Sequence, residues 1–210
     1  MSSFDQNCKT CHRLSTFLKD LRTKHPAYHN LPVAPFGKKQ PELLIVGLAP
    51  GMHGANATGR PFTGDHAGIL LYETLYQYGF SSAPVSQSAT DGLKLIRCCI
   101  TNAVKCLPPE NKPTTPEINE CNRFLRHEIE GIKKGAVILA LGTIAHKAVL
   151  RAFDYKQSEY KFSHGARHQL KNNFILLDSY HCSRYNTQTK RLTPEMFQQV
   201  FAQARTIIDE

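Results

Sequence analysis

Apolar positions are distributed along this chain in two distinct patterns, which together predict its fold. Four short apolar runs are predicted to be strands. The run from Ala136 to Leu141 is continuously apolar, as in strands that are buried on both faces of a sheet. The predicted strands cover residues 43–46, 93–104, 136–141 and 174–177.

Between these runs, apolar residues recur at helical spacing. Leu71, Leu75 and Tyr78, for example, fall on one face of a helix. Two other helices have marked starts, because Thr115-Pro116-Glu117 and Thr193-Pro194-Glu195 each supply a capping threonine, a first-turn proline and an acid. Further helical patterns occupy residues 14–21, 64–78 and 142–149. The alternation predicts a three-layer α/β/α sandwich with a central four-stranded, mostly parallel sheet.

Length and composition fit one domain over residues 1–210, because 41% of the residues are apolar. The proline-rich stretch from Pro26 to Pro41 carries several apolar side chains, so residues 1–41 are predicted to be an ordered arm packed on the domain. There is no long apolar run and no basic-then-apolar start, so we expect no membrane span, no signal peptide and a cytoplasmic location. The formal charge of +9 suits a polyanionic partner, although a solvated basic surface explains it equally well.

The most informative stretch is Gly47 to Asp65, which reads GLAPGMHGANATGRPFTGD. It lies between the first predicted strand and a predicted helix. Its five glycines allow positive φ angles and close approach of a ligand to the backbone. Amides just before a helix also favour anions. The stretch is neither a Walker loop nor a GxGxxG motif, and a tight strand-to-helix connection would explain it without any ligand.

Ligands of parallel sheets bind beyond the carboxyl ends of the strands. Three polar stretches are predicted to lie there: the glycine-rich stretch, Thr101-Asn102 and His181-Cys182-Ser183. Their convergence follows from the predicted topology.

The seven cysteines indicate a metal centre, because the chain has no export signal and structural disulfides are rare in a reducing cytosol. Cys8 and Cys11 have two residues between them, and Cys106 and Cys121 bracket a proline-rich loop. Four thiolates from two segments can hold zinc or a [4Fe–4S] cluster. The wide second spacing favours the cluster, and four unrelated thiols are the remaining alternative.

The other cysteines are interpreted differently. Cys98 and Cys99 are adjacent in a predicted strand, so they point to opposite faces and cannot serve one site. We interpret both as small core residues. The position of Cys182 beside a candidate catalytic histidine leaves its role open.

These stretches together resemble the uracil-DNA glycosylase superfamily, in particular its iron–sulfur branch called family 5 or UDGb. The stretch Gly47 to Asp65 resembles the family's first motif. Residues Ile100 to Glu117, ITNAVKCLPPENKPTTPE, resemble its middle region. HCSRYNTQTKRLTPEM, from His181, resembles its second motif, with Cys182 where proline is more usual. The resemblance covers nearly the whole chain.

The resemblance implies a monofunctional glycosylase that flips uracil out of DNA and hydrolyses its N-glycosidic bond, initiating base excision repair. It further implies action on hypoxanthine and ethenocytosine, double-stranded DNA as the partner, a monomer, and no membrane. By position, a structural [4Fe–4S] cluster would fall on Cys8, Cys11, Cys106 and Cys121.

Two residues are candidates for catalysis. His181 can donate a hydrogen bond to O2 of the base as negative charge develops, or it can be an ordinary surface or capping histidine. Asp65 can position water or stabilise the cationic sugar, or it can merely cap the following helix. Related branches carry an acid or amide directly after the first strand, where this chain has Leu48, Ala49 and Pro50.

Other candidates bind the substrate. Asn102 is expected to read uracil through its amide, with Asn111 as a weaker alternative. Phe62 is expected to stack on the flipped base or to be a core residue. Around them, backbone at Gly47 and Ala49 shapes the pocket floor, Ser183 contacts a phosphate, Arg184 or Tyr185 fills the gap in the duplex, and Asn186 braces that loop.

Two other functions share many of these features. One is a metalloprotein that grips or covalently captures damaged DNA without turnover. The other is an α/β enzyme acting on a free nucleotide or nucleoside, since the same pocket would accept an isolated base.

Overall fold

The computed structural model describes residues 3–210, and its centre is a six-stranded mixed sheet in the order β1-β3-β2-β4-β6-β5. Four central strands are parallel: β2 (Leu43–Gly47), β3 (Cys98–Asn102), β4 (Val137–Leu141) and β6 (Ile175–Ser179). The edges are the short antiparallel strands β1 (Phe36–Gly37) and β5 (Arg167–Gln169). The predicted parallel core is confirmed.

The prediction of four strands was wrong at both edges of the sheet. The two edge strands are two and three residues long and carry no apolar run, so the sequence pattern does not reveal them. The predicted strand at 93–104 was also too long. Arg97 has a φ of 55°, which interrupts extended backbone, and Leu95 forms only an isolated bridge with Ser81. The strand itself begins at Cys98.

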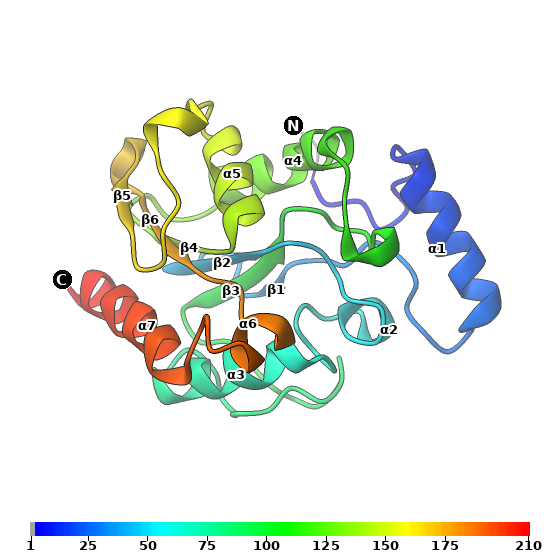
Figure 1. The fold of residues 1–210 in the computed structure, drawn as a ribbon, viewed down its shortest axis with the longest axis horizontal. Helices are drawn as coiled ribbons and strands as arrows, with labels where there is room; N and C mark the ends of the chain where they lie inside the picture. Colours follow the sequence, from blue (N-terminus) through cyan, green and yellow to red (C-terminus); the bar gives the residue numbers. More distant parts are fainter. Residues whose placement is uncertain (1–2) are drawn as a thin grey trace.

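Helices cover both faces of the sheet and complete the predicted three-layer arrangement (Figure 1). On one face lie α3 (His66–Gln77) and α7 (Pro194–Asp209), and on the other lie α4 (Thr115–Glu130) and α5 (Thr143–Ala152). Two short helices, α2 (Ala55–Thr58) and α6 (Arg184–Gln188), interrupt the connections after β2 and β6. Single 3₁₀ turns lie at Pro109–Asn111, Gln157–Glu159 and Lys171–Asn173.

Alternation along each strand divides the apolar core into two layers. Leu43 and Ile45 of β2 pack with the α3 and α7 side, whereas Leu44 and Val46 pack with the α4 and α5 side. All four side chains are buried, as expected for a strand covered on both faces. This double burial fixes the register of the sheet and therefore the positions of its carboxyl ends.

The N-terminal arm packs beside this sandwich rather than in it. Helix α1 (His12–Lys24) lies next to α2 at one end of the molecule (Figure 1). Its Leu14 packs against Val104 and Phe124. The proline-rich stretch is ordered, and the amide of Val33 donates a 2.7 Å hydrogen bond to the carbonyl of Lys105. No helix within residues 3–210 combines the length and apolarity needed to cross a membrane.

Candidate active site

A cavity of about 510 Å³ lies at the carboxyl ends of the parallel strands. The register explains its position, because Gly47 pairs with Asn102 and Leu141 pairs with Ser179 at this edge of the sheet. The three polar stretches predicted to converge therefore do so. The lining includes Leu48, Ala49, Phe62, Asp65, His66, Asn102, Asn111, Gly142, Thr143, His181, Ser183 and Arg184.

Asn102 ends β3 with its side chain aimed across the sheet edge. It is only 3% exposed, and its Oδ1 has no hydrogen-bond partner. Buried polar atoms without a partner are rare in proteins and call for an explanation. A ligand donor in the cavity would supply one. Asn111, the weaker candidate for base reading, also lines the cavity but is exposed to solvent.

Gly47 leaves the space that this arrangement needs. A Cβ on Gly47 would lie 2.4 Å from Asn102 Oδ1 and 2.6 Å from Cζ of Phe62. Neither approach is sterically possible, so any larger residue would displace one of these two side chains. The glycine is thus required by side-chain crowding, and its backbone has no positive φ angle.

Phe62 lies beneath His181. The two rings are stacked with centroids 5.8 Å apart and an interplanar angle of 28°. Phe62 has a φ of 55°, an unusual backbone conformation for a bulky residue. Its ring is buried in the core, and one side of it also lines the cavity. The two locations expected for Phe62 therefore do not exclude each other.

His181 is held as a neutral imidazole. Burial lowers its pKa to about 4, so the ring is uncharged at neutral pH. Its Nδ1 is buried without a hydrogen-bond partner. Asn186 Nδ2 donates a 2.8 Å bond to the His181 carbonyl, and a Cβ on Gly142 would lie 3.5 Å from the His181 Cβ. Asn186 therefore ties α6 to the His181 backbone.

Asp65 both caps a helix and faces the cavity. Its Oδ1 accepts a 2.9 Å bond from the Gly68 amide at the start of α3. Its Oδ2 lies on the side of the glycine-rich stretch, where a Cβ on Gly54 would be 2.5 Å away. Burial raises the pKa of this carboxyl above its ordinary value, while the Gly68 and Ala67 amides oppose that rise. The two alternatives expected for Asp65 are geometrically compatible.

The segment after His181 forms a short exposed ridge beside the cavity. Ser183 caps α6 by accepting from the Asn186 amide. Arg184 and Tyr185 follow at the start of this helix, and Tyr185 is 71% exposed. Cys182, whose role the sequence left open, is fully buried in the core layer under α7.

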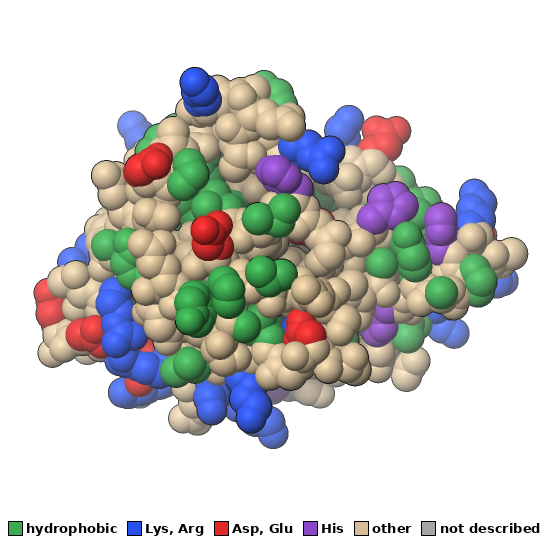
Figure 2. All heavy atoms as spheres, turned by 90° about the horizontal axis from the view of Figure 1, so that it is seen from below, with side chains coloured by type: hydrophobic (Ala, Val, Ile, Leu, Met, Phe, Trp, Pro, Cys, Tyr) green, Lys and Arg blue, Asp and Glu red, His purple; other side chains and the backbone are tan. Residues whose placement is uncertain are grey.

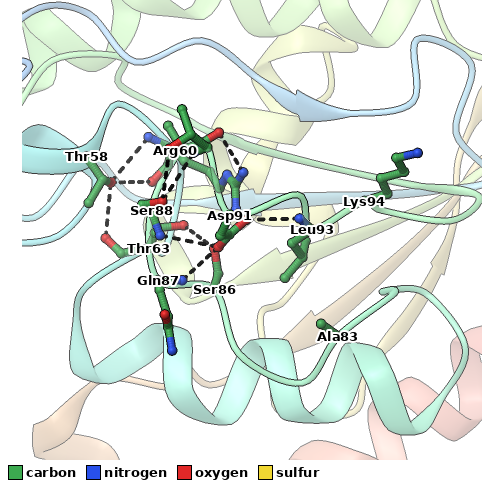
Figure 3. A network of polar contacts seen from close by, with 12 residues as sticks. Thr58, Arg60, Thr63, Ala83, Ser86, Gln87, Ser88, Asp91, Leu93 and Lys94 are labelled. Carbon is green, nitrogen blue, oxygen red and sulfur yellow. Dashed lines mark hydrogen bonds and ion pairs between the residues drawn. The ribbon is translucent and has the colours of Figure 1, made fainter.

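A buried arginine that sequence reasoning missed anchors the glycine-rich stretch (Figure 3). Arg60 is 5% exposed, pairs with Asp91 at 2.7 Å and also donates to Ser86. Burial alone would raise the pKa of Asp91, but donors from Leu93, Arg60 and nearby amides hold it well below its usual range. Figure 3 shows how this network ties residues 58–63 to residues 86–93. No local sequence pattern pairs these two segments.

A second cavity of about 500 Å³ adjoins the first. The two share Phe62, Asp65, His66 and Arg184 in their walls. The surface on the α3 side carries a central group of hydrophobic side chains, with lysines and arginines mainly towards its edges (Figure 2). Ile69 and Val85, both exposed, line the second cavity.

A second buried polar network holds the end of β6. Asp178 is fully buried and lies 2.8 Å from His146 Nδ1 and 3.1 Å from His168 Nε2. These three side chains come from α5, β5 and β6, and they fix the strand three residues before His181. Sequence reasoning missed this network because its members are 10 to 32 residues apart.

The four predicted metal-binding cysteines line one small cavity between α1 and α4. Cys8 and Cys11 come from the arm, Cys106 from the segment after β3 and Cys121 from α4. Arg123 lies 3.5 Å from the Cys8 Sγ, and burial raises the pKa of the Cys106 thiol. Cys98 and Cys99 are buried in the sheet, as predicted.

Among residues 3–210, the only three or more His, Cys, Asp or Glu ligand atoms within 4.8 Å of one another belong to His146, His168 and Asp178. Four cysteine thiols can hold either a zinc ion or a [4Fe–4S] cluster.

Comparison with known proteins agrees with this geometry. The family model of the uracil DNA glycosylase superfamily matches residues 34–205. A Type-5 uracil-DNA glycosylase of Thermus thermophilus is 42% identical over 95% of this chain and 93% of its own length. One of Pyrobaculum aerophilum is 39% identical over 94% of this chain and 88% of its own length. A Type-4 uracil-DNA glycosylase of Archaeoglobus fulgidus is 35% identical over 56% of this chain and 52% of its own length.

Proposed function

The chain belongs to the uracil DNA glycosylase superfamily, and we propose that it excises uracil from DNA by hydrolysing the N-glycosidic bond, the first step of base excision repair. The observation that carries this proposal is the unpartnered Oδ1 of Asn102 in a cavity that also holds His181 and Asp65. Hypoxanthine and ethenocytosine are proposed as further substrates, double-stranded DNA as the preferred partner, and the monomer as the active form.

Uracil must leave the base stack before any chemistry occurs. Extruding a nucleotide costs about a few kcal/mol in unstacking and unpairing. The cavity of about 510 Å³ accommodates one base with part of its sugar. We assign the exposed ridge at Ser183, Arg184 and Tyr185 to the duplex side, where serine contacts a phosphate and a long side chain fills the vacated space.

Asn102 supplies the recognition of the base. Its Oδ1 accepts from N3–H of uracil, and its Nδ2 donates to O4. Cytosine has no hydrogen on N3, so the same amide would leave its buried Oδ1 unpaired. A site built to pair a donor disfavours bases that lack it, because the buried acceptor then remains unsatisfied. Ethenocytosine also lacks this hydrogen, so we expect its excision to proceed without the Asn102 bond and more slowly than that of uracil.

His181 and Asp65 supply the matched charges. As the bond breaks, negative charge develops on the base and positive charge on the sugar. A neutral imidazole donates a hydrogen bond to O2 of the departing base without carrying a proton that burial disfavours. The Asp65 carboxylate, held in place by the Gly68 amide, faces the sugar or orients the attacking water.

The cysteine cavity is proposed to hold a [4Fe–4S] cluster on Cys8, Cys11, Cys106 and Cys121. The gathering of the four cysteines around one cavity supports this assignment, as do the hydrogen-bond donors nearby, because Arg123 donates to the Cys8 Sγ and the Lys105 amide donates to the Cys121 Sγ. When bound, the cluster supplies a structural cross-link, because it would join the arm to the segment after β3 and to α4.

A lesion panel tests the function. Wild type is expected to release uracil from a labelled duplex and to leave alkali-labile abasic sites. His181→Ala is expected to bind the same duplex but to release uracil at least about 100-fold more slowly. Binding of uracil-containing DNA by wild type without any release would instead identify a protein that grips damage without turnover. Release from free deoxyuridine, unaffected by competing duplex, would identify a nucleoside enzyme.

A further inference from the structure

A buried lysine connects the base-reading asparagine to the cysteine cavity. Lys105 is 1% exposed and lies between Asn102, at the end of β3, and Cys106. Neither the expected chemistry nor the metal site uses this side chain. Lysine is almost never fully buried unless it is paired, so its position requires an explanation.

The Lys105 ammonium group donates hydrogen bonds to three acceptors at the end of β3 and on α4. Its Nζ lies 2.5 Å from Thr101 Oγ1, 2.8 Å from the Asn102 carbonyl oxygen and 2.9 Å from Glu128 Oε2. Thr101 donates in turn to Glu128 at 2.8 Å. The last two residues of β3 are thus tied to α4 through one ammonium group and one carboxylate.

The backbone of Lys105, in contrast to its side chain, is bonded to the cysteine site and to the N-terminal arm. Its amide donates to the Cys121 Sγ at 3.3 Å, and its carbonyl accepts from Val33 of the arm at 2.7 Å. The next residue is Cys106. Any change in the spacing of Cys106 and Cys121 would therefore move the Lys105 backbone and with it the group that holds the Asn102 carbonyl.

We propose that Lys105 is a positioning residue that transmits the assembly of the four-cysteine site to Asn102. The amide of Asn102 discriminates between bases only as well as its main chain is held, because its Oδ1 has no protein partner to fix its orientation. Lys105 holds that main chain from behind the sheet edge, and the cysteine site holds Lys105. The proposal rests on the proposed function, since it takes Asn102 to be the base reader.

The experiment compares uracil with N3-methyluracil in the same duplex, under single-turnover conditions. N3-methyluracil lacks the N3–H group from which Asn102 Oδ1 is expected to accept a hydrogen bond. The ratio of the excision rates on uracil and N3-methyluracil therefore measures how well Asn102 is placed. Lys105→Met removes the ammonium and keeps the length of the side chain. We expect the rate on uracil to fall about 10- to 100-fold and the ratio to approach that of Asn102→Ala.

A double-mutant cycle separates positioning from general damage. In an Asn102→Ala background, Lys105→Met is expected to change the uracil rate by less than about threefold, because the residue it positions is gone. Lys134→Met, exposed before the amino end of β4, is the matched control and should leave rate and ratio unchanged. Equal losses on both bases, or additive effects in the cycle, would overturn the proposal.

Two further measurements keep the outcomes distinct. Bound metal and duplex affinity are measured for each variant, and Lys105→Met should retain both. If Lys105→Met does not fold, Glu128→Gln keeps the size of the partner and should shift the ratio in the same direction.

Selective ¹⁵N labelling of asparagine adds a readout that needs no turnover, because the Asn102 side-chain signal should move in Lys105→Met and on metal removal. An unmoved signal would overturn the proposal, whereas absence of uracil release by wild type would overturn only the proposed function.

Discussion

Gly47 and Asn102 face each other across the parallel pair β2 and β3, and a Cβ on the glycine would lie 2.4 Å from Asn102 Oδ1. The Asn102 amide, which we propose reads the base, thus has its place because its neighbour has no side chain. This relationship links the glycine-rich stretch, which sequence alone leaves open to a purely structural explanation, to the expected chemistry of the pocket.

Gly47→Ala is therefore expected to impair catalysis directly. The new methyl group would push either Asn102 or Phe62 out of place, and Phe62 supports His181. We expect the single-turnover rate on uracil to fall by roughly 10- to 1,000-fold, with a stability loss of about 1–3 kcal/mol from overpacking. Gly131→Ala, where the nearest atom is 3.5 Å from the added Cβ, is the matched control. Normal uracil release by Gly47→Ala would remove the steric explanation.

Asp65→Asn separates the cap from the charge. Asparagine caps helices as well as aspartate does, so the bond from the Gly68 amide and the melting temperature should be retained. The rate on uracil should nevertheless fall at least about 100-fold, because the carboxylate charge is lost. Asp65→Ala should also lose about 0.5–2 kcal/mol of stability. Near-wild-type turnover by Asp65→Asn would reduce this residue to a cap.

The pH dependence of catalysis should show that His181 works as a neutral ring. Its pKa in the folded protein is about 4, so the single-turnover rate should not decline between pH 6 and pH 8. The acid side of the profile should reflect Asp65, whose pKa burial raises above 3.8. A rate that falls as pH rises through 6.5 would indicate catalysis by an imidazolium instead.

The same burial makes stability depend on pH. The unfolded chain binds a proton on His181 below the ordinary pKa of 6.5, whereas the folded protein does so only near 4. The unfolded state therefore binds more protons between these values, and stability rises with pH across that window. Urea unfolding of wild type and His181→Gln at pH 4.5 and pH 7 should give a smaller pH-dependent difference for the variant.

The Arg60–Asp91 pair should be important for both stability and turnover. Arg60→Ala removes a charge-assisted bond to Asp91, whose carboxylate keeps its bonds from the Gln87, Ser88 and Leu93 amides, so we expect a stability loss of about 1–3 kcal/mol. The loop that carries Phe62 should loosen, so the rate on uracil should fall as well. Arg184→Ala, at an exposed position, is the comparison: its melting temperature should be unchanged, and its duplex affinity should fall.

Metal content tests the cysteine site. Purified wild type is expected to be brown and to contain iron and sulfide. Cys121→Ser should lose the colour and lower the melting temperature, whereas Cys99→Ala, which removes a buried thiol outside the set, should keep the colour. A colourless protein with one bound zinc would contradict the cluster.

The parallel strands and long helices could be predicted because each carries its own periodicity, and the glycine-rich stretch because its spacing is local. Phe62 and Asp65 each had two candidate roles in the sequence, and the structure shows why the pattern could not choose, since each side chain occupies both positions. Arg60, Lys105 and Asp178 were missed for a different reason. Their partners come from other segments, and a buried polar network has no periodic signature along the chain.

The cysteines of this set are synthesised at different times, because they come from the beginning and the middle of the chain. Cys8 and Cys11 leave the ribosome first, and Cys121 follows some hundred residues later, after β2 and β3 have been made. A group bound by all four sulfurs is therefore inserted only once α4 exists, and it closes a long chain segment whose ends would otherwise meet at an entropic cost. If the proposed iron–sulfur cluster occupies this site, chains made under iron starvation should lack the link between the arm and α4 that the cluster would add to the Leu14 and Val33 contacts.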